Sequence, residues 1–271
     1  MSGVHSATNL DRYVPGASVI HRADPVVKLL ATLGFIVVVA TVPPGAWAAF
    51  AMLYGVVWTA VLLSGIGPLR ILRRSMLVLP FILLPLPSMF TKPGEPLFDV
   101  PLGVFTLTAT DSGAVFVASV MLKSWASVTA AALYTATTPF LTTLETLRTL
   151  RVPAVLVAIV SFMYRYLFLL VDEAERLIRA RAARCGVPME SAGRTGGGIR
   201  WRAGVAGGMA GSLFVRTYER SERVYFAMLA RGFDGSLPAP RRTPSRLPSL
   251  AVGAGALSLL VLLGTAARMM V

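Results

Sequence analysis

Charged residues are scarce in this sequence. They make up 14% of its 271 residues, whereas soluble domains carry about 25%. Hydrophobic residues make up 55%, and they fall in long apolar runs, which are the signature of membrane-spanning helices. The composition therefore excludes an ordinary soluble domain and predicts an all-α, polytopic membrane protein.

Cysteine, histidine and lysine are also rare. The single cysteine, Cys185, excludes an internal disulfide. With only His5 and His21 beside it, we expect no tight site for a soft or borderline metal. No lysine follows Lys123, which excludes a phosphate-binding loop from the glycine-rich stretch 193–211. Because no nucleophile elbow or pair of carboxylates in an apolar pocket is visible either, we expect no catalytic site and no cofactor.

The few charges are unequally divided between the two signs. Lysine and arginine together number 26 and aspartate and glutamate 13, which gives a net charge of +13. Such an excess suits nucleic-acid binding, but it also suits a membrane protein that keeps its positive residues on the cytoplasmic side. The apolar runs favour the second interpretation, so we expect a lipid bilayer around the chain and no nucleic-acid partner.

Five apolar runs predict about five transmembrane helices. The first run ends at the Pro-Pro-Gly sequence of 43–45, and its helix is expected to begin near Pro25. The third run contains three prolines, which membrane helices tolerate when neighbours satisfy the freed backbone groups. The segment 91–111 is expected to be a loop. The predicted spans are 25–42, 46–66, 76–90, 113–137 and 250–267.

One lysine, Lys123, lies inside the fourth predicted span. A charge at this depth usually faces other helices or extends toward the membrane interface. We therefore expect a structural role for Lys123, and a role in transport is the alternative.

The segment that follows the fourth run has a different character. Thr138-Pro139 is typical of a helix N-cap followed by proline at the first helical position. Leucine then recurs every three residues among threonines and charged residues, which predicts an amphipathic surface helix. These leucines are Leu141, Leu144, Leu147 and Leu150.

The run 152–171 is long enough to span, but the charges around it argue against a crossing. Residues 172–246 contain 14 arginines and 7 acidic residues. Arg70, Arg73 and Arg74 mark the loop after the second span as cytoplasmic, so a crossing by 152–171 would place the arginine-rich stretch outside, against the positive-inside bias. We predict a long helix in a cytoplasmic or interfacial layer and a cytoplasmic N-terminus. A sixth span is the alternative.

Two charged helices are predicted after residue 171, and they end alike in alanine, arginine and a small residue. Alanine leaves room for close approach, and arginine projects donors that can hold a carboxylate bidentately. Glycine can end a helix in the left-handed conformation. A single such end fits an ordinary helix cap, but two copies favour docking motifs. The motif residues are Ala183, Arg184, Cys185, Ala230, Arg231 and Gly232.

Glycines are concentrated between the two motifs. The first part of the stretch is expected to be a flexible linker. Further along, Gly204 and Gly208, like Gly207 and Gly211, are spaced by four residues. This spacing predicts a small-residue helix face that another helix can approach closely.

The paired motifs resemble those of the T component of energy-coupling-factor transporters. The stretch 211–235, GSLFVRTYERSERVYFAMLARGFDG, is similar to the cobalt-type branch of that family, CbiQ. HRADPVVKLL from His21 and SFMYRYLFLLVDEAERL from Ser161 are similar too, so the resemblance covers nearly the whole chain. Cys185 departs from the pattern, because a glycine or another small residue is usual there, and Gly186 follows one place later.

The resemblance implies a division of labour. Two cytoplasmic ABC-type ATPase subunits bind and hydrolyse ATP, and each accepts one coupling helix in a groove, with Arg184 and Arg231 as anchors. The coupling helices in turn tilt a membrane-embedded substrate-binding subunit, the S component, which releases cobalt inside. This chain is then a non-enzymatic, multi-pass subunit of the cell membrane.

The chain is expected to have three parts. Residues 1–137 form an N-terminal membrane domain of four spans, 138–246 hold the cytoplasmic coupling helices and the glycine-rich linker, and 247–271 form a final transmembrane helix. A T component that serves nickel, biotin or other vitamins is an alternative, because the selecting ligands are expected on another protein. A stand-alone secondary transporter would need inverted repeats, and none is visible. A membrane-bound enzyme would need a catalytic cluster.

Overall fold

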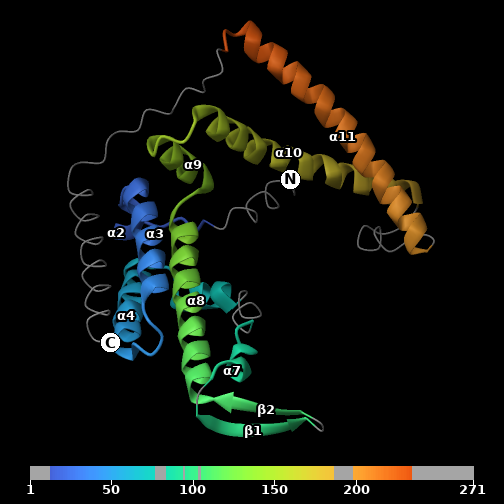
Figure 1. Ribbon diagram of the computed structural model, residues 1–271. Helices are drawn as coiled ribbons and strands as arrows, with labels where there is room; N and C mark the ends of the chain where they lie inside the picture. The colour runs from blue at the N-terminus through green and yellow to red at the C-terminus, as the bar shows by residue number, and fades with distance from the viewer. Residues whose placement is uncertain (1–12, 77–83, 94, 103–104, 186–197, 234–271) are drawn as a thin grey trace. The chain divides into compact units, whose positions relative to one another are not determined.

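Figure 1 shows the computed structural model, which describes residues 13–76, 84–93, 95–102, 105–185 and 198–233. The chain divides into two compact units. Among the described residues, the N-terminal unit holds 13–146 and the paired-helix unit holds 147–233. The predicted helical fold is confirmed, and a two-stranded hairpin is the one departure from it within these residues.

The N-terminal unit is built around one long central helix, α8, which contacts most of the other helices of the unit (Figure 1). Its 27 residues make it about 40 Å long, enough to cross a bilayer core of about 30 Å. The elements of the unit are α2 (Val19–Arg22), α3 (Pro25–Thr41), α4 (Trp47–Leu63), α5 (Pro68–Ser75), α7 (Ser88–Thr91), β1 (Pro96–Leu102), β2 (Phe105–Thr110), α8 (Asp111–Thr137) and most of α9 (Phe140–Thr149).

The first long helix begins where the sequence predicts. Asp24 is the N-cap of α3, and its carboxylate accepts a 2.8 Å hydrogen bond from the backbone N–H of Val26. Pro25 occupies the first helical turn, where its missing N–H costs nothing. After α3 the chain turns at Gly45, whose φ of 90° suits glycine. The Gly45 N–H donates to Ser119 Oγ of α8 at 3.1 Å, which fixes the turn against the central helix.

The core of the N-terminal unit lies between α3, α4, α5 and α8. At the start of α8 the backbone of Met89 approaches Gly113 closely, so that an added Cβ would lie 2.6 Å from the Met89 carbonyl oxygen. On the other side, Tyr54 Oη donates to the Leu122 carbonyl at 2.9 Å and ties α4 to α8. The buried apolar side chains of the core include those of Phe35, Val39, Phe50, Leu53, Val57, Val61, Ile71, Ala126, Leu133 and Ala136.

The segment 91–111, expected to be a loop, contains regular structure. It forms an antiparallel hairpin in which β1 pairs with β2, for example at Asp99 and Thr108. Pro96 and Pro101 are compatible with this hairpin, because both of its strands are edge strands, where proline is tolerated. Thr110 then caps α8 by accepting from the Gly113 N–H.

The amphipathic helix predicted after the fourth span is α9. It begins at Phe140, so Pro139 lies just before it rather than in its first turn. Leu144 is buried, whereas Leu141 and Leu150 are exposed. The predicted apolar face is therefore only partly buried within the chain.

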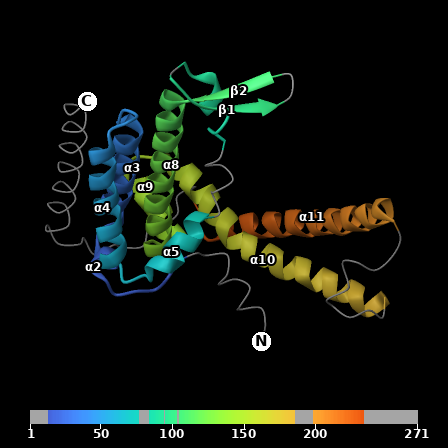
Figure 2. The same ribbon diagram turned by 90° about the horizontal axis from the view of Figure 1, so that it is seen from below.

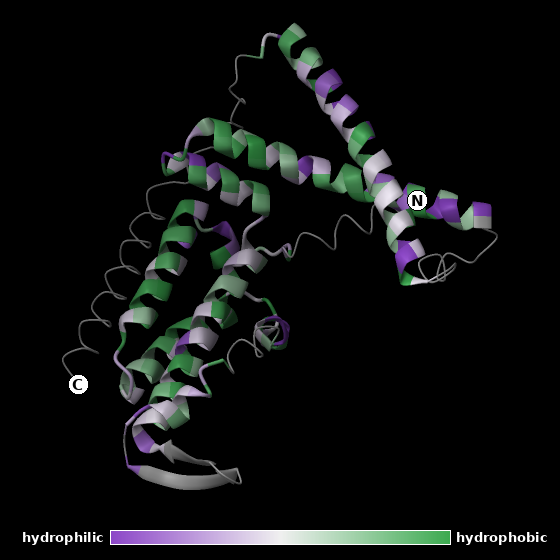
Figure 3. Cartoon of the chain, turned by 45° about the vertical axis from the view of Figure 1, so that its right-hand side comes forward, coloured by the Kyte–Doolittle hydropathy of each residue, from purple (hydrophilic) through white to green (hydrophobic). Residues whose placement is uncertain are grey.

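The paired-helix unit consists mainly of α10 (Ala154–Cys185) and α11 (Ile199–Ala230), which are 32 residues long each (Figure 2). At 1.5 Å per residue, each is about 48 Å long. The residues of α10 change from mainly hydrophobic to more hydrophilic along its length (Figure 3). By length and composition α10 is able to cross a membrane, so its interfacial placement stays a prediction from the charge distribution.

Two other predicted spans lie partly or wholly outside the described residues. The third run lacks 77–83, and the last run, 250–267, is outside in full. The first two spans correspond to α3 and α4, which are apolar helices of 17 residues each.

Candidate functional site in the paired-helix unit

The second arginine motif forms a complete glycine cap at the end of α11. The Gly232 N–H donates to the Leu229 carbonyl at 2.9 Å, and the Phe233 N–H donates to the Met228 carbonyl at 3.0 Å. Gly232 has a φ of 79°. This is the Schellman arrangement, in which a left-handed residue turns the chain back over the last carbonyls. The predicted left-handed glycine is therefore confirmed for this motif.

The cap leaves the motif side chains open to solvent. Ala230 ends α11, Arg231 follows it as the C-cap, and both residues are exposed, as is Gly232. Within the described part of the chain, the Arg231 guanidinium forms no ion pair or hydrogen bond. A partner with a carboxylate can therefore reach it without displacing a contact.

The first motif differs from the second in its register. Helix α10 continues through Cys185, so Arg184 lies inside the last helical turn rather than after it. Ala183 and Arg184 are exposed, and Arg184 has no side-chain partner among the residues described. Gly186, the expected end of this helix, lies outside the described residues.

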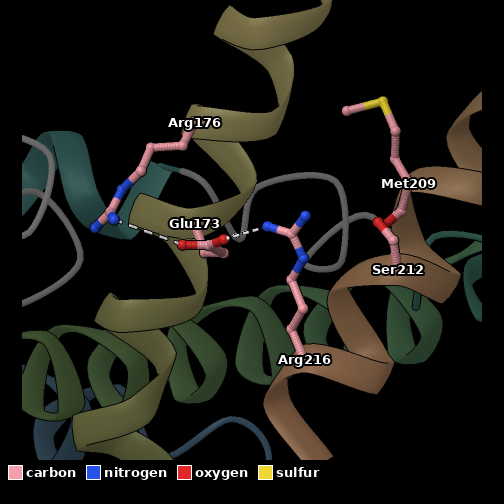
Figure 4. A network of polar contacts seen from close by, with 5 residues as sticks. All are labelled: Glu173, Arg176, Met209, Ser212 and Arg216. Carbon is pink, nitrogen blue, oxygen red and sulfur yellow. Dashed lines mark hydrogen bonds and ion pairs between the residues drawn. The ribbon is translucent and has the colours of Figure 1, made fainter. Parts of the chain in front are cut away.

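The two helices that carry the motifs cross each other in antiparallel fashion. At the crossing, Arg216 Nη1 of α11 donates to Glu173 Oε1 of α10 at 2.9 Å (Figure 4). Arg176 Nη1 lies 3.7 Å from the other oxygen of the same carboxylate. Further along, the Arg181 guanidinium lies over the Trp201 ring, 5.5 Å from its centroid. This crossing was not predicted from the sequence, since the partners of the ion pair lie 43 residues apart.

A groove of about 520 Å³ opens between α10 and α11 beside this ion pair. Phe162, Tyr166 and Leu170 contribute to its α10 side, while Arg220 and Val224 contribute to its α11 side. The groove thus has an aromatic and aliphatic wall that faces an arginine-bearing wall. Because side chains leave this space open, the helices do not pack tightly there.

Helix α11 has no buried residue in the part of the chain that the structure describes. A Cβ added at Gly204, Gly207, Gly208 or Gly211 would meet no atom within 4 Å. The close helix approach predicted for these glycines is therefore not made by any described part of the chain. Large side chains on the same helix are exposed as well: Ile199, Trp201, Phe214, Val215, Tyr218, Tyr225, Phe226 and Leu229.

Polar contacts of the N-terminal unit serve to connect its elements. His21 Nε2 lies 3.1 Å from the Val14 carbonyl, which can only accept, so this nitrogen carries a proton. Lys28 Nζ donates to the Thr137 carbonyl at the end of α8 at 3.3 Å. Lys123 Nζ donates to the Ala40 carbonyl of α3 at 3.2 Å, a contact that fits its expected structural role. In the described residues, no three His, Cys, Asp or Glu side chains form a group able to hold a metal ion.

Comparison with known proteins identifies the family to which this chain is similar. Residues 16–244 match the family CbiQ, described as "Cobalt transport protein". The transmembrane protein EcfT of the energy-coupling factor transporter of Listeria innocua is 29% identical over 83% of this chain and 84% of its own length. The cobalt transport protein CbiQ of Rhodobacter capsulatus is 27% identical over 82% of this chain and 83% of its own length.

A third relative, an uncharacterized protein of Methanocaldococcus jannaschii, is 28% identical over 70% of this chain. The match spans 63% of that relative's length. The family match covers most of the sequence and includes both arginine motifs. The chain therefore belongs to the CbiQ family and is a transmembrane component of the energy-coupling-factor transporter type.

Proposed function

We propose that this chain couples ATP hydrolysis in two cytoplasmic ATPase subunits to a substrate-binding subunit in the membrane. Arg184 and Arg231 anchor one ATPase copy each, and α10 and α11 carry the resulting motion. The observation that carries the proposal is the exposure of both arginines, each without a described partner, at the ends of two long crossing helices. The chain itself hydrolyses no ATP.

The proposed topology follows from this role. Residues 1–137 supply four membrane spans, 138–246 lie in the cytoplasm or at its membrane interface, and 247–271 supply a last span in the cell membrane. The N-terminus then lies in the cytoplasm. The excess of arginine after residue 171 supports this orientation, because positive residues are retained on the cytoplasmic side.

Cobalt ion is the proposed cargo. The family description and the name of the Rhodobacter capsulatus relative both refer to cobalt transport. The cargo is bound by the substrate-binding partner, so uptake must be measured on the whole transporter. Uptake of labelled cobalt that excess nickel fails to suppress supports the assignment. A transporter that instead accumulates nickel or a vitamin contradicts it.

The coupling role is tested by retention of ATPase subunits on the affinity-purified complex. Arg184→Ala or Arg231→Ala alone is expected to weaken docking, because loss of one member of a desolvated ion pair costs about 2–5 kcal/mol. The remaining arm still holds the ATPases, since two linked contacts act multivalently. The double variant is therefore expected to lose far more ATPase than either single variant.

Two further variants sharpen this test. Arg231→Lys is expected to rescue poorly, because an ammonium group cannot reproduce the bidentate fork of a guanidinium. Arg200→Ala removes an exposed arginine near the start of α11 and serves as the matched control, with ATPases retained. A double motif variant that keeps its ATPases and transports normally would show that the two arginines are only helix caps.

A further inference from the structure

The crossing of α10 and α11 is held by a carboxylate that arginines approach from two sides. Arg216 donates to one oxygen of Glu173 at 2.9 Å, and Arg176 lies 3.7 Å from the other oxygen. The Glu173 side chain is only 17% exposed. A carboxylate so enclosed needs its partners, because a charge removed from water without compensation is costly.

The helices extend well beyond this crossing in both directions. Arg184 lies 11 residues after Glu173 on α10, or about 16 Å along the helix axis. Arg231 lies 15 residues after Arg216 on α11, or about 22 Å along the axis. Because the helices are antiparallel, the two motif ends leave the crossing along different arms (Figures 1 and 2).

The angle between these arms depends on few contacts. On one side of the ion pair, the 520 Å³ groove separates the helices. On the other side, the Arg181 guanidinium rests on the Trp201 ring. Packing of α11 adds little, since none of its residues is buried. The Glu173–Arg216 pair is thus the short, charge-assisted contact at the point where the arms meet.

We propose that Glu173 is a positioning residue: through Arg216 it fixes the angle between α10 and α11, so that a displacement at one arginine motif is passed to the other. The geometric half of this inference concerns the chain alone. Its consequence for transport rests on the proposed function.

The geometric half is tested by the distance between the two arms in the purified full-length chain. Spin labels at Ala180→Cys and Ala227→Cys, both exposed positions, report this distance in a Cys185→Ser background. The parent is expected to give a narrow distance distribution, and Glu173→Gln a broad one. Glu175→Gln is the matched control, because Glu175 pairs with Arg179 on its own helix at 3.2 Å and leaves the crossing intact. Identical distributions for Glu173→Gln and Glu175→Gln would overturn the proposal.

Variants of the donor separate this pair from general packing. Arg216 offers one nitrogen, Nη1, to Glu173, and an ammonium group can supply a single donor as well. Arg216→Lys is therefore expected to keep the narrow distribution, whereas Arg216→Met broadens it. Equal broadening by both variants would show that the arginine shape, not the charge at the crossing, sets the angle, and would contradict the proposal.

The transport half is tested on the assembled transporter. Glu173→Gln is expected to retain its ATPases and their hydrolysis, with a severalfold fall in cargo transported per ATP hydrolysed. Unchanged coupling in a variant with broadened distances would overturn the role in transmission. If the parent chain retains no ATPases at all, the proposed function fails, while the distance measurements still decide whether Glu173 fixes the crossing.

Discussion

The N-terminal unit has a buried core of large apolar side chains, and helix α11 of the paired-helix unit has none. In the first, Phe50 of α4 is 3% exposed within a core shared by four helices. In the second, Phe214 of α11 is 70% exposed, and no residue of that helix is buried. The N-terminal unit therefore has an apolar core of its own, although Leu62 and Leu69 at its surface remain exposed, whereas α11 has no buried residue against the described part of the chain.

This difference indicates that α11 is the part of the chain whose apolar surface is available to partner proteins or lipid. Apolar surface left in water costs about 25 cal/mol per Å², and large exposed patches mark interaction or membrane surfaces. The exposed aromatic residues of α11 share their helix with four glycines that no described part of the chain approaches closely. The helix thus carries exposed aromatic side chains and a small-residue face. Both features fit a subunit that is stabilised by contacts with partners and lipid.

The largest expected difference in stability is between two variants that truncate one phenylalanine in each unit. Phe50→Ala should destabilise the isolated chain by about 3–5 kcal/mol, because it removes buried contacts and leaves a cavity. Phe214→Ala should change the free energy of unfolding by less than about 0.5 kcal/mol, as surface substitutions do. Denaturant titration in detergent micelles measures both. Equal losses would mean that α11 has a core of its own, and the comparison would be wrong.

A second pair of variants adds one methyl group to a glycine in each unit. Gly113→Ala should destabilise by about 1–3 kcal/mol through overpacking, because the new Cβ would lie 2.6 Å from the Met89 carbonyl oxygen. Gly208→Ala meets open space in α11, so it should stabilise by about 0.5–1 kcal/mol through helix propensity.

The sign of the Gly208 effect is informative. In the isolated chain only the helix responds, and thermal unfolding in micelles should show a rise in midpoint. In the assembled transporter, a partner helix packed on the glycine face would be pushed away. Destabilisation of the isolated chain by Gly208→Ala would contradict the open environment of this residue.

Local signals in the sequence predicted local structure well. Pro25 marked the start of α3, because proline acts within the first helical turn. Gly232 marked the end of α11 for the same reason, since the left-handed conformation at that point suits glycine. These residues act on their own backbone neighbourhood, which a single sequence displays directly.

Contacts between distant residues were not predictable in this way. Glu173 and Arg216 each stand in a charged helical stretch where many pairings are equally plausible, and only the crossing of the helices selects one. The hairpin of β1 and β2 was also missed, although its strands are neighbours in the sequence, because the segment 91–111 was interpreted as a loop. Pro96 and Pro101 fit the hairpin, since both of its strands are edge strands. The candidate site residues were proposed from their motif, but the contact that joins their helices was not predicted.

The smallest expected effect concerns two helix ends within the paired-helix unit that share one geometry. After α9, the Val152 N–H donates to the Leu147 carbonyl and the Arg151 N–H donates to the Arg148 carbonyl. These bonds repeat the Schellman pattern seen at Gly232, but the left-handed position is held by Arg151, with a φ of 66°. A side chain in this conformation carries a strain of about 1 kcal/mol that glycine avoids.

Substitutions at Arg151 and Gly232 should therefore change the stability of the chain in opposite directions. Arg151→Gly should stabilise the chain by about 0.5 kcal/mol, because relief of strain exceeds the entropy that glycine adds to the unfolded state. Gly232→Ala should destabilise by about 1 kcal/mol, because it introduces the same strain. Arg151→Ala is the control, since it removes the exposed guanidinium but keeps the strained backbone and should leave stability unchanged. If Arg151→Ala stabilises as much as Arg151→Gly, the arginine charge and not the left-handed backbone is the source of the effect, and the two helix ends differ in more than the residue at the turn.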